Sequence, residues 1–384
     1  MRNSTGHDAD FNERPFIAIW EATQACDLAC VHCRASAQPL RSSFELSTEE
    51  TQRLIDQIAD MRVPVFVITG GDPLKRPDIF DLVEYATARG VRTSLTPSAT
   101  PLLTRGAIAE LQRRGLARLA VSLDGSSAEI HDAFRRVPGS YEWTLRAVRW
   151  ARELHLPVQI NTTITRRNLA DFDDMARLLE SLDIAMWSVF FLVPTGRGQL
   201  QDLISAEEFE AVFARLYAVA RSARFDVKTT EAQHYRRYVL QQRAAERRQH
   251  APASAAGSKP AATPANGNPI ARESLSDGIG RAPRGLNDAK GFVFISHFGE
   301  VFPSGFLPIS AGNVRRQALA EIYRHSPLFV ALRDTEKLQG KCGECEFRHV
   351  CGGSRARAFA LSGDAHAEEP CCVYQPWAAV PAVG

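Results

Sequence analysis

Six short apolar runs alternate with amphipathic patterns of helical period between residues 16 and 220, and this alternation constrains the fold more than any other feature. Strands separated by helices of ordinary length pair in parallel through right-handed crossovers, which predicts an α/β fold. Six units are too few for a closed eight-unit barrel, so a partial TIM-type (β/α)6 barrel and an open doubly wound sheet are both compatible. The predicted strands are 16–21, 65–69, 92–96, 119–123, 158–164 and 187–193, and the predicted helices are 47–59, 77–88, 104–114, 141–154, 169–182 and 205–220.

The composition changes after the last of these helices. Residues 241–285 include a long stretch of Ala, Pro, Ser and Gly without hydrophobic periodicity, so we expect a flexible linker or insertion there. The barrel core then spans 14–240, after a polar stretch at 1–13 that we expect to be disordered. Residues 286–384 form a small C-terminal α+β unit, which opens with a predicted β-hairpin around 297–299.

Charge and hydropathy exclude some classes of partner. The chain has 46 Lys and Arg against 44 Asp and Glu, and this net charge of +2 gives no electrostatic basis for binding nucleic acid or an anionic membrane. Residues 1–13 contain no apolar signal segment, and the longest apolar run, 185–193, is too short to span a membrane. We therefore expect a cytoplasmic protein, in which clustered cysteines are more often metal ligands or redox groups than disulfides.

Cys26, Cys30 and Cys33 follow the first predicted strand with the spacing C-x3-C-x2-C. This spacing places three thiolates on one short loop, where they can hold three corners of a cubane iron–sulfur cluster. Because the next cysteine is Cys342, one iron stays open to an exogenous chelator, which is a catalytic arrangement. The alternative is a structural zinc site completed by His32 or by a remote ligand.

This motif, placed after the first strand of a βα array, resembles the signature of the radical S-adenosylmethionine (radical SAM) enzymes. In that family the amino and carboxylate groups of S-adenosylmethionine chelate the open iron of a [4Fe–4S] cluster. The resemblance implies that the reduced cluster cleaves the sulfonium bond and releases a 5′-deoxyadenosyl radical, which abstracts hydrogen from a substrate. It also implies a low-potential electron donor such as ferredoxin or flavodoxin.

The ends of the later strands fit the same resemblance. A Gly-Gly-Asp-Pro run matches the family's Gly-Gly-Glu-Pro motif, whose main chain contacts the methionine amino group, with Asp72 replacing the usual Glu. Ser122 and Asp124 share one face of the fourth strand, where the family binds the methionine carboxylate and the ribose. Asn161 matches a ribose contact, and His32 takes the position whose main chain meets adenine. The resemblance therefore implies cofactor contacts at His32, Gly70, Gly71, Asp72, Pro73, Ser122, Asp124 and Asn161.

A second group of cysteines near the C-terminus has the spacing C-x2-C-x5-C, with an adjacent pair about twenty residues further on. It resembles the extension called SPASM, or its shorter relative twitch, which holds auxiliary iron–sulfur clusters. Ser304 and Arg355 stand where the full pattern has further cysteines, so we expect one auxiliary [4Fe–4S] cluster rather than two. A four-cysteine zinc site is the alternative. The implied ligands are Cys342, Cys345, Cys351 and Cys372, with Cys371 as the alternative to Cys372.

The substrate is the least determined part of the function. The short, cysteine-poor C-terminal unit resembles enzymes of haem d1 synthesis and of the alternative haem pathway, which alter tetrapyrrole propionate side chains. Under this hypothesis Arg355 and Arg357 are candidates for binding propionates. Glu231, His234 and Tyr235 are candidates for lining the substrate cavity, and a capped surface helix is the alternative for that segment.

Three other functions stay open on the sequence. SPASM-type units are common in enzymes that mature a ribosomally made peptide, so the substrate is a small molecule or a peptide. A non-catalytic zinc-binding protein is the main alternative of another class. A thiol–disulfide oxidoreductase would use Cys342 and Cys345 as a C-x-x-C pair, but no predicted strand precedes them.

Overall fold

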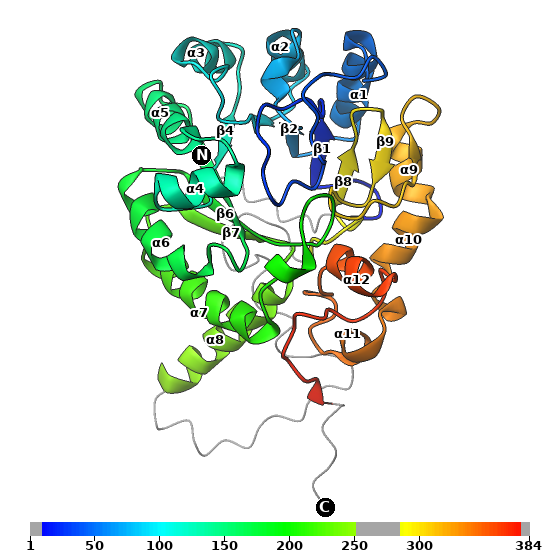
Figure 1. Cartoon of the computed structure of the whole chain (residues 1–384). Coiled ribbons are helices and arrows are strands. Elements are labelled where there is room, and N and C mark those ends of the chain that lie inside the picture. Colours follow the sequence, from blue (N-terminus) through cyan, green and yellow to red (C-terminus); the bar gives the residue numbers. More distant parts are fainter. Residues whose placement is uncertain (1–9, 251–284, 378–384) are drawn as a thin grey trace, which may run out of the picture.

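The structure is a computed structural model and describes residues 10–250 and 285–377. A single ten-stranded sheet runs through both predicted units in the order β10-β9-β8-β1-β2-β3-β4-β5-β6-β7. Figure 1 shows the strands inside the molecule, with helices arranged around them. The strands are β1 (Ile17–Glu21), β2 (Val65–Thr69), β3 (Thr93–Leu95), β4 (Arg118–Ser122), β5 (Val158–Ile164), β6 (Met186–Phe191), β7 (Asp226–Thr230), β8 (Phe292–Ile295), β9 (Glu300–Phe302) and β10 (Gly312–Asn313).

Strands β1 to β6 pair in parallel in chain order, which confirms the predicted βα array. The first helix begins at a capping box, in which Ser47 and Glu50 each accept a hydrogen bond from the other's main-chain amide. The helices are α1 (Thr48–Asp60), α2 (Ile79–Ala88), α3 (Arg105–Arg113), α4 (Ala128–Arg135), α5 (Ser140–Glu153), α6 (Phe172–Ser181), α7 (Ala206–Ser222), α8 (His234–His250), α9 (Leu319–His325), α10 (Pro327–Arg333), α11 (Gly340–Glu344) and α12 (Arg355–Ser362).

Alternation along each strand separates the packed core from a central cavity. On β2, Phe66 and Ile68 are fully buried in the core, whereas Val67 and Thr69 line the cavity. Successive side chains of a strand point to opposite faces, so one face of the whole sheet packs on helices and the other is left for a ligand.

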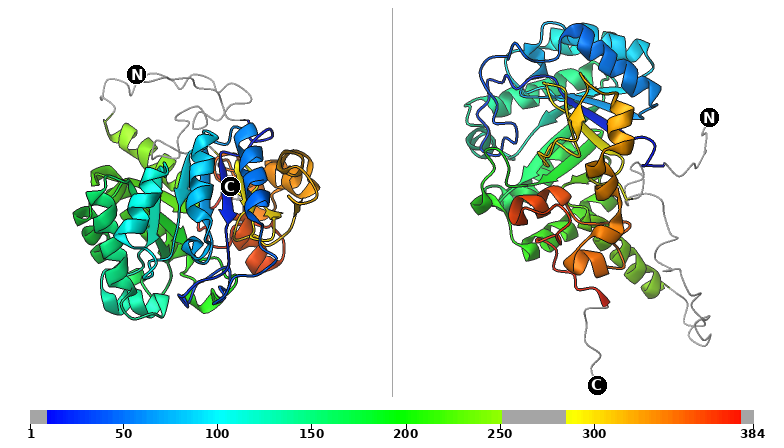
Figure 2. Two further views of the ribbon diagram at one scale, coloured as in Figure 1. Left: turned by 90° about the horizontal axis from the view of Figure 1, so that it is seen from above. Right: turned by 90° about the vertical axis from the view of Figure 1, so that its right-hand side faces the viewer.

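Two features of the sheet were not predicted. Strand β7 adds a seventh parallel strand beside β6, and only Val227 of its five residues is buried, so its apolar pattern is too weak to detect. The hairpin β8–β9 does not stand apart from the core, because β8 pairs in parallel with β1, with Ile17 opposite Phe292. Figure 2 shows this hairpin (yellow) beside β1 (blue), with the C-terminal helices on the same side.

The predicted boundary at residue 240 needs correction. Helix α8 continues through 241–250, which the composition assigned to the linker. Contacts with α7 stabilise this last part of α8. The Tyr217 hydroxyl donates to Glu246 Oε1 at 3.1 Å, and Arg221 pairs with the same carboxylate. The rest of the predicted linker, 251–284, and residues 1–9 of the predicted disordered N-terminus lie outside the described residues.

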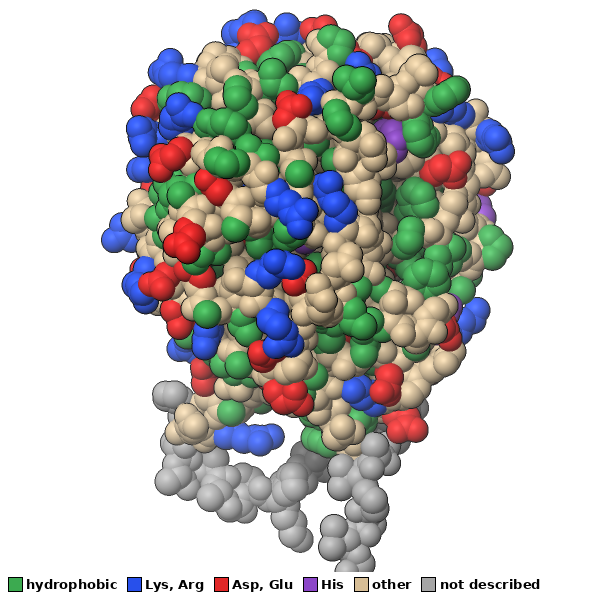
Figure 3. Space-filling view, viewed as in Figure 1, with side chains coloured by type: hydrophobic (Ala, Val, Ile, Leu, Met, Phe, Trp, Pro, Cys, Tyr) green, Lys and Arg blue, Asp and Glu red, His purple; other side chains and the backbone are tan. Residues whose placement is uncertain are grey.

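Figure 3 shows side chains of both signs spread over the visible face, in keeping with the net charge of +2. No helix in the described part of the chain combines the length and the apolar character that crossing a membrane requires.

Candidate active site

The three N-terminal cysteines lie on the loop after β1, at the carboxyl ends of the parallel strands. Cys26 Sγ accepts a hydrogen bond from the Leu28 amide at 3.3 Å and lies 3.2 Å from Ser98 Oγ. Arg135 Nη1 donates to Cys30 Sγ at 3.4 Å. Burial raises the pKa of the Cys26 thiol, and a bound cationic centre would favour its thiolate. Thiols with N–H donors aimed at their sulfurs fit the ligand set of an iron–sulfur cluster.

The glycine pair after β2 explains how this loop is held. Gly71 N donates to Thr23 O at 2.7 Å, and the next amide donates to Ala25 O at 2.7 Å. A Cβ at Gly71 would lie 2.4 Å from Ala25 O, and one at Gly70 would lie 2.5 Å from Thr23 O. The two segments therefore approach too closely for any side chain, and this contact fixes the main chain next to Cys26.

A cavity of about 130 Å³ lies beside these two loops. Its wall brings together residues from the ends of several strands and from helix α4, as expected for a ligand site of a parallel sheet. Three predicted cofactor contacts, Gly70, Gly71 and Ser122, line it together with Ser98, His131 and Arg135.

Asp124 acts on this cavity through another residue. Its side chain is fully buried, forms an ion pair with Arg135 and accepts a hydrogen bond from the Thr163 amide at 2.8 Å. Arg135 in turn lines the cavity and contacts Cys30. The contact of Arg135 with a cysteine of the loop was not predicted from the sequence.

The other predicted contacts also lie outside the wall of this cavity. Asp72 accepts from Leu74 N and Thr100 Oγ1, and burial raises its pKa to about 6. Pro73 follows it as the buried first residue of the turn η1 (Pro73–Lys75). Asn161 lines a larger cavity instead. Burial lowers the pKa of His32, and its ring packs 4.6 Å from that of Phe134. The assigned cofactor roles of these residues stay predictions.

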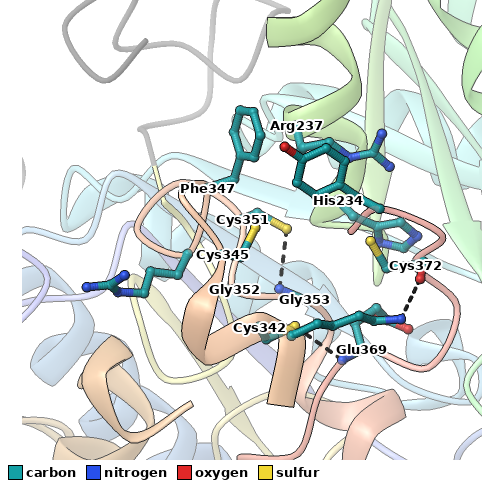
Figure 4. Close-up of a pocket in the computed structure, with 13 residues that line it drawn as sticks. His234, Arg237, Cys342, Cys345, Phe347, Cys351, Gly352, Gly353, Glu369 and Cys372 are labelled. Carbon is teal, nitrogen blue, oxygen red and sulfur yellow. Dashed lines mark hydrogen bonds between the residues drawn. The ribbon is translucent and has the colours of Figure 1, made fainter. Parts of the chain in front are cut away.

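Four C-terminal cysteines line a second, smaller site, shown in Figure 4. Among the described residues, no three His, Cys, Asp or Glu side chains are close enough to hold one metal ion, and these thiols surround a cavity instead. The adjacent Cys371 is not part of the wall, which favours Cys372 as the fourth ligand. The residues concerned are Cys342, Cys345, Cys351 and Cys372.

Two of these four sulfurs accept a main-chain hydrogen bond, which Figure 4 marks, from Glu369 N to Cys342 Sγ at 3.2 Å and from Gly353 N to Cys351 Sγ at 3.4 Å. Gly353 has φ +64°, a conformation that favours glycine. The main-chain amides of Phe347 and Tyr374 act to lower the pKa of the Cys345 and Cys372 thiols, against the larger effect of burial. Amide donors of this kind fit the thiolates of an iron–sulfur cluster.

The two positions that lack the expected cysteines are used for hydrogen bonding. Ser304 bonds the buried carboxyl of Asp288. Arg355 donates to the carbonyl oxygens of Ala365 and Ala367 at 2.9 and 2.7 Å. Both positions therefore stabilise the C-terminal unit, and neither supplies a thiolate.

The hypothesis that Arg355 and Arg357 bind propionates is wrong, because both guanidinium groups are buried and already engaged. Arg357 Nη1 lies 3.0 Å from Glu369 Oε2, and its other nitrogens donate to main-chain carbonyls at the end of β6 and at Glu231. Burial alone would raise the pKa of Glu369, but the Arg357 charge lowers it to about 2. Arg357 therefore joins α12 to the barrel.

A larger cavity of about 330 Å³ lies against the inner face of the sheet. Aromatic and aliphatic side chains form much of its wall, including Phe190, Phe292, Phe294 and Phe306. Cationic side chains interrupt that wall, namely Arg34, Arg92, Arg118, Lys228 and Arg236.

Two buried acids, Glu231 and Asp288, complete the wall of this cavity. Burial and the charge of Asp288 raise the pKa of Glu231 to about 8. Of the three residues that were candidates for lining a substrate cavity, Glu231 lines this larger cavity. His234 lines the cysteine cavity instead, and Tyr235 is buried in the core.

Replacing Gly71 with alanine is expected to weaken S-adenosylmethionine binding at least tenfold, because the new Cβ forces the loop after β2 away from the cysteine loop. Equilibrium dialysis with the cluster-loaded protein measures the affinity. Gly106→Ala is the matched control, since the nearest atom to its Cβ is 3.7 Å away and alanine favours helix α3. Equal affinities of the two variants would contradict the role of this contact.

Comparisons with known proteins agree with this geometry. Residues 20–179 match the family model of the radical SAM superfamily. Residues 288–346 match the model of an iron–sulfur cluster-binding domain called SPASM. An AdoMet-dependent heme synthase of Oleidesulfovibrio alaskensis is 41% identical over 94% of this chain and 87% of its own length. A second, from Methanosarcina barkeri, is 39% identical over 94% and 97%.

Solved structures show the same fold. SuiB of Streptococcus suis, bound to its precursor peptide SuiA, has a TM-score of 0.70 at 15% identity and covers 94% of this chain and 76% of its own. The native anSMEcpe structure with bound AdoMet has a TM-score of 0.65, at 15% identity and 93% coverage of each chain. The chain therefore belongs to the radical SAM superfamily and is an enzyme that uses S-adenosylmethionine, a catalytic [4Fe–4S] cluster and an auxiliary iron–sulfur cluster in a SPASM domain.

Proposed function

We propose that the enzyme acts on a tetrapyrrole that carries carboxylate side chains, in the synthesis of a haem-type cofactor. The observation that carries this proposal is the cavity on the inner face of the sheet, which combines aromatic walls with five cationic side chains. A macrocycle with carboxylates needs both an apolar surface for its ring and cations for its acids. The heme synthases that share about 40% of the sequence support the same substrate class.

The position of Arg34 links this cavity to the cysteine loop. Arg34 follows Cys33 directly, and its guanidinium lies 4.3 Å from the centre of the Phe294 ring and 3.1 Å from Glu21. Both Arg34 and Phe294 line the cavity. A substrate in this cavity therefore lies next to the place where the catalytic cluster is bound.

The proposed function gives each group of residues a separate role. Cys26, Cys30 and Cys33 hold the catalytic cluster, whose reduced form supplies a 5′-deoxyadenosyl radical from S-adenosylmethionine. Ser122, Arg135 and the glycine pair form the walls that position the bound cofactor. The four C-terminal cysteines named above hold the auxiliary cluster. A cytoplasmic low-potential carrier such as ferredoxin or flavodoxin delivers the electron.

Titration of the reconstituted protein with an iron porphyrin that carries free propionates, followed by absorbance, tests the substrate class. We expect saturable binding by the wild-type protein. Lys228→Met removes one cation that would pair with a propionate, and we expect it to bind about tenfold more weakly, which corresponds to a loss of about 1.4 kcal/mol in binding free energy. The exposed Lys337→Met is the control. Equally strong binding of the propionate methyl ester would contradict recognition of the carboxylates.

Modification of a ribosomally made peptide is the second candidate. A PqqA peptide cyclase of Rhodopseudomonas palustris is 31% identical over 98% of this chain and 91% of its own length. The same titration separates the two candidates, because a peptide-modifying enzyme has no reason to saturate with the porphyrin.

A further inference from the structure

His234 is a buried imidazole at the wall of the auxiliary-cluster cavity. It is the first residue of α8, has no exposed surface and lines the cavity together with the four cysteines. Figure 4 shows its ring beside Cys372, with the side chain of Arg237 nearby. The ring thus comes from the barrel, whereas the cysteines come from the C-terminal unit.

The ring is held by packing rather than by hydrogen bonds. Its centre lies 5.2 Å from the Phe209 ring and 4.8 Å from the Phe213 ring. The main chain of Cys371 approaches it, but neither ring nitrogen makes a hydrogen bond of normal geometry within the described residues. A buried polar group without a partner costs about 1–3 kcal/mol, so an imidazole kept in such a place indicates an acceptor that arrives with a ligand.

The surroundings limit what that acceptor is. The other charged groups of the wall are Arg237, Lys341, Arg348 and Glu369. The carboxylate of Glu369 already pairs with Arg357 and accepts the Ser354 and Cys371 amides. The Tyr374 hydroxyl also lines the wall, but it is bonded to Glu346. The acceptors that a bound cluster would bring to the cavity are sulfur atoms, either of the thiolates or of the cluster that they hold.

We infer that His234 donates a hydrogen bond from its ring to a sulfur of the auxiliary cluster and thereby raises the reduction potential of that cluster. An N–H group aimed at a cluster sulfur stabilises the reduced form, which carries more negative charge. This inference rests on the proposed ligand set, but it is independent of the identity of the substrate. It gives the barrel a direct influence on the redox chemistry of the C-terminal unit.

The test uses the full-length, reconstituted enzyme with both clusters. Redox titration followed by electron paramagnetic resonance is expected to show an auxiliary-cluster potential about 59 mV more negative in His234→Phe, which is a tenfold change in a one-electron equilibrium. His234→Gln retains an N–H donor and is expected to shift less. The catalytic cluster of the same molecule is the internal reference, and its potential should not move. An unchanged auxiliary potential in His234→Phe would overturn the inference.

A second measurement does not depend on how the variants fold. In wild-type enzyme labelled with nitrogen-15 histidine, pulsed electron paramagnetic resonance of the reduced auxiliary cluster should detect a weak nitrogen coupling. No coupling, or the strong coupling of a nitrogen bound directly to iron, would overturn the inference. Iron analysis comes first, because a protein with only about four irons per chain has no auxiliary cluster and would refute the ligand set itself.

Discussion

Replacing Cys30 with alanine is expected to abolish the formation of 5′-deoxyadenosine from S-adenosylmethionine. A cubane that loses one of three protein thiolates loses a corner, and the Arg135 donor on that sulfur loses its partner. Iron per chain should fall from about eight to about four, because the C-terminal cysteines are unaffected. Chromatography of the products after anaerobic reduction, together with iron and sulfide analysis, measures both effects.

The neighbouring C-terminal cysteines provide matched controls for this experiment. Cys371→Ala should retain both clusters and full cleavage, because Cys371 is not part of the cavity wall that contains Cys372. Cys372→Ala should lose the auxiliary iron while still producing 5′-deoxyadenosine. If Cys30→Ala cleaved S-adenosylmethionine at the wild-type rate, the assignment of the N-terminal cysteines to the catalytic cluster would be refuted.

Replacing Arg357 with methionine is expected to destabilise the protein by about 3–5 kcal/mol, the usual cost of leaving a buried charge without its partner. Arg357 and Glu369 are both fully buried, and the same guanidinium binds main-chain oxygens of the barrel. For a chain of 384 residues the loss corresponds to roughly 4–6 °C in the midpoint of thermal unfolding. Thermal unfolding under anaerobic conditions measures it.

Arg152→Met is the control, because Arg152 pairs with Asp183 at the surface and such pairs contribute less than about 1 kcal/mol. The double variant Arg357→Met with Glu369→Gln should recover part of the lost stability, since it removes the unpaired charge. A midpoint that is unchanged in Arg357→Met would mean that this ion pair does not hold the C-terminal unit to the barrel.

Local patterns in the sequence predicted the parts of the molecule that depend on local chemistry. The cysteine spacings, the capping box at Ser47 and the alternation on strands such as β5 all act over a few residues, and the structure has each of them. The glycine pair at 70–71 was also recognised, although the reason for it, contact with Thr23 and Ala25, is visible only in three dimensions.

The parts that could not be predicted depend on pairing between distant segments. Strand β7 has almost no apolar pattern and exists because β6 offers it a hydrogen-bonding edge. The burial of Arg357 was hidden because its partner, Glu369, lies beyond the end of α12 in an irregular segment. The sequence shows that Arg357 lies near the cysteine motif, but it does not show whether this side chain contacts a ligand or a buried acid such as Glu369.

The pairing of β8 with β1 has a mechanical consequence. Glu21, at the end of β1, contacts both Arg34 from the cysteine loop, at 3.1 Å, and His297 from the hairpin, at 2.7 Å. The sheet is continuous through both units, and the contacts of Glu21 with Arg34 and His297 join the cysteine loop to the hairpin. Heating should therefore melt the molecule in a single cooperative step that bleaches both iron centres together, even though its sequence reads as two separate modules.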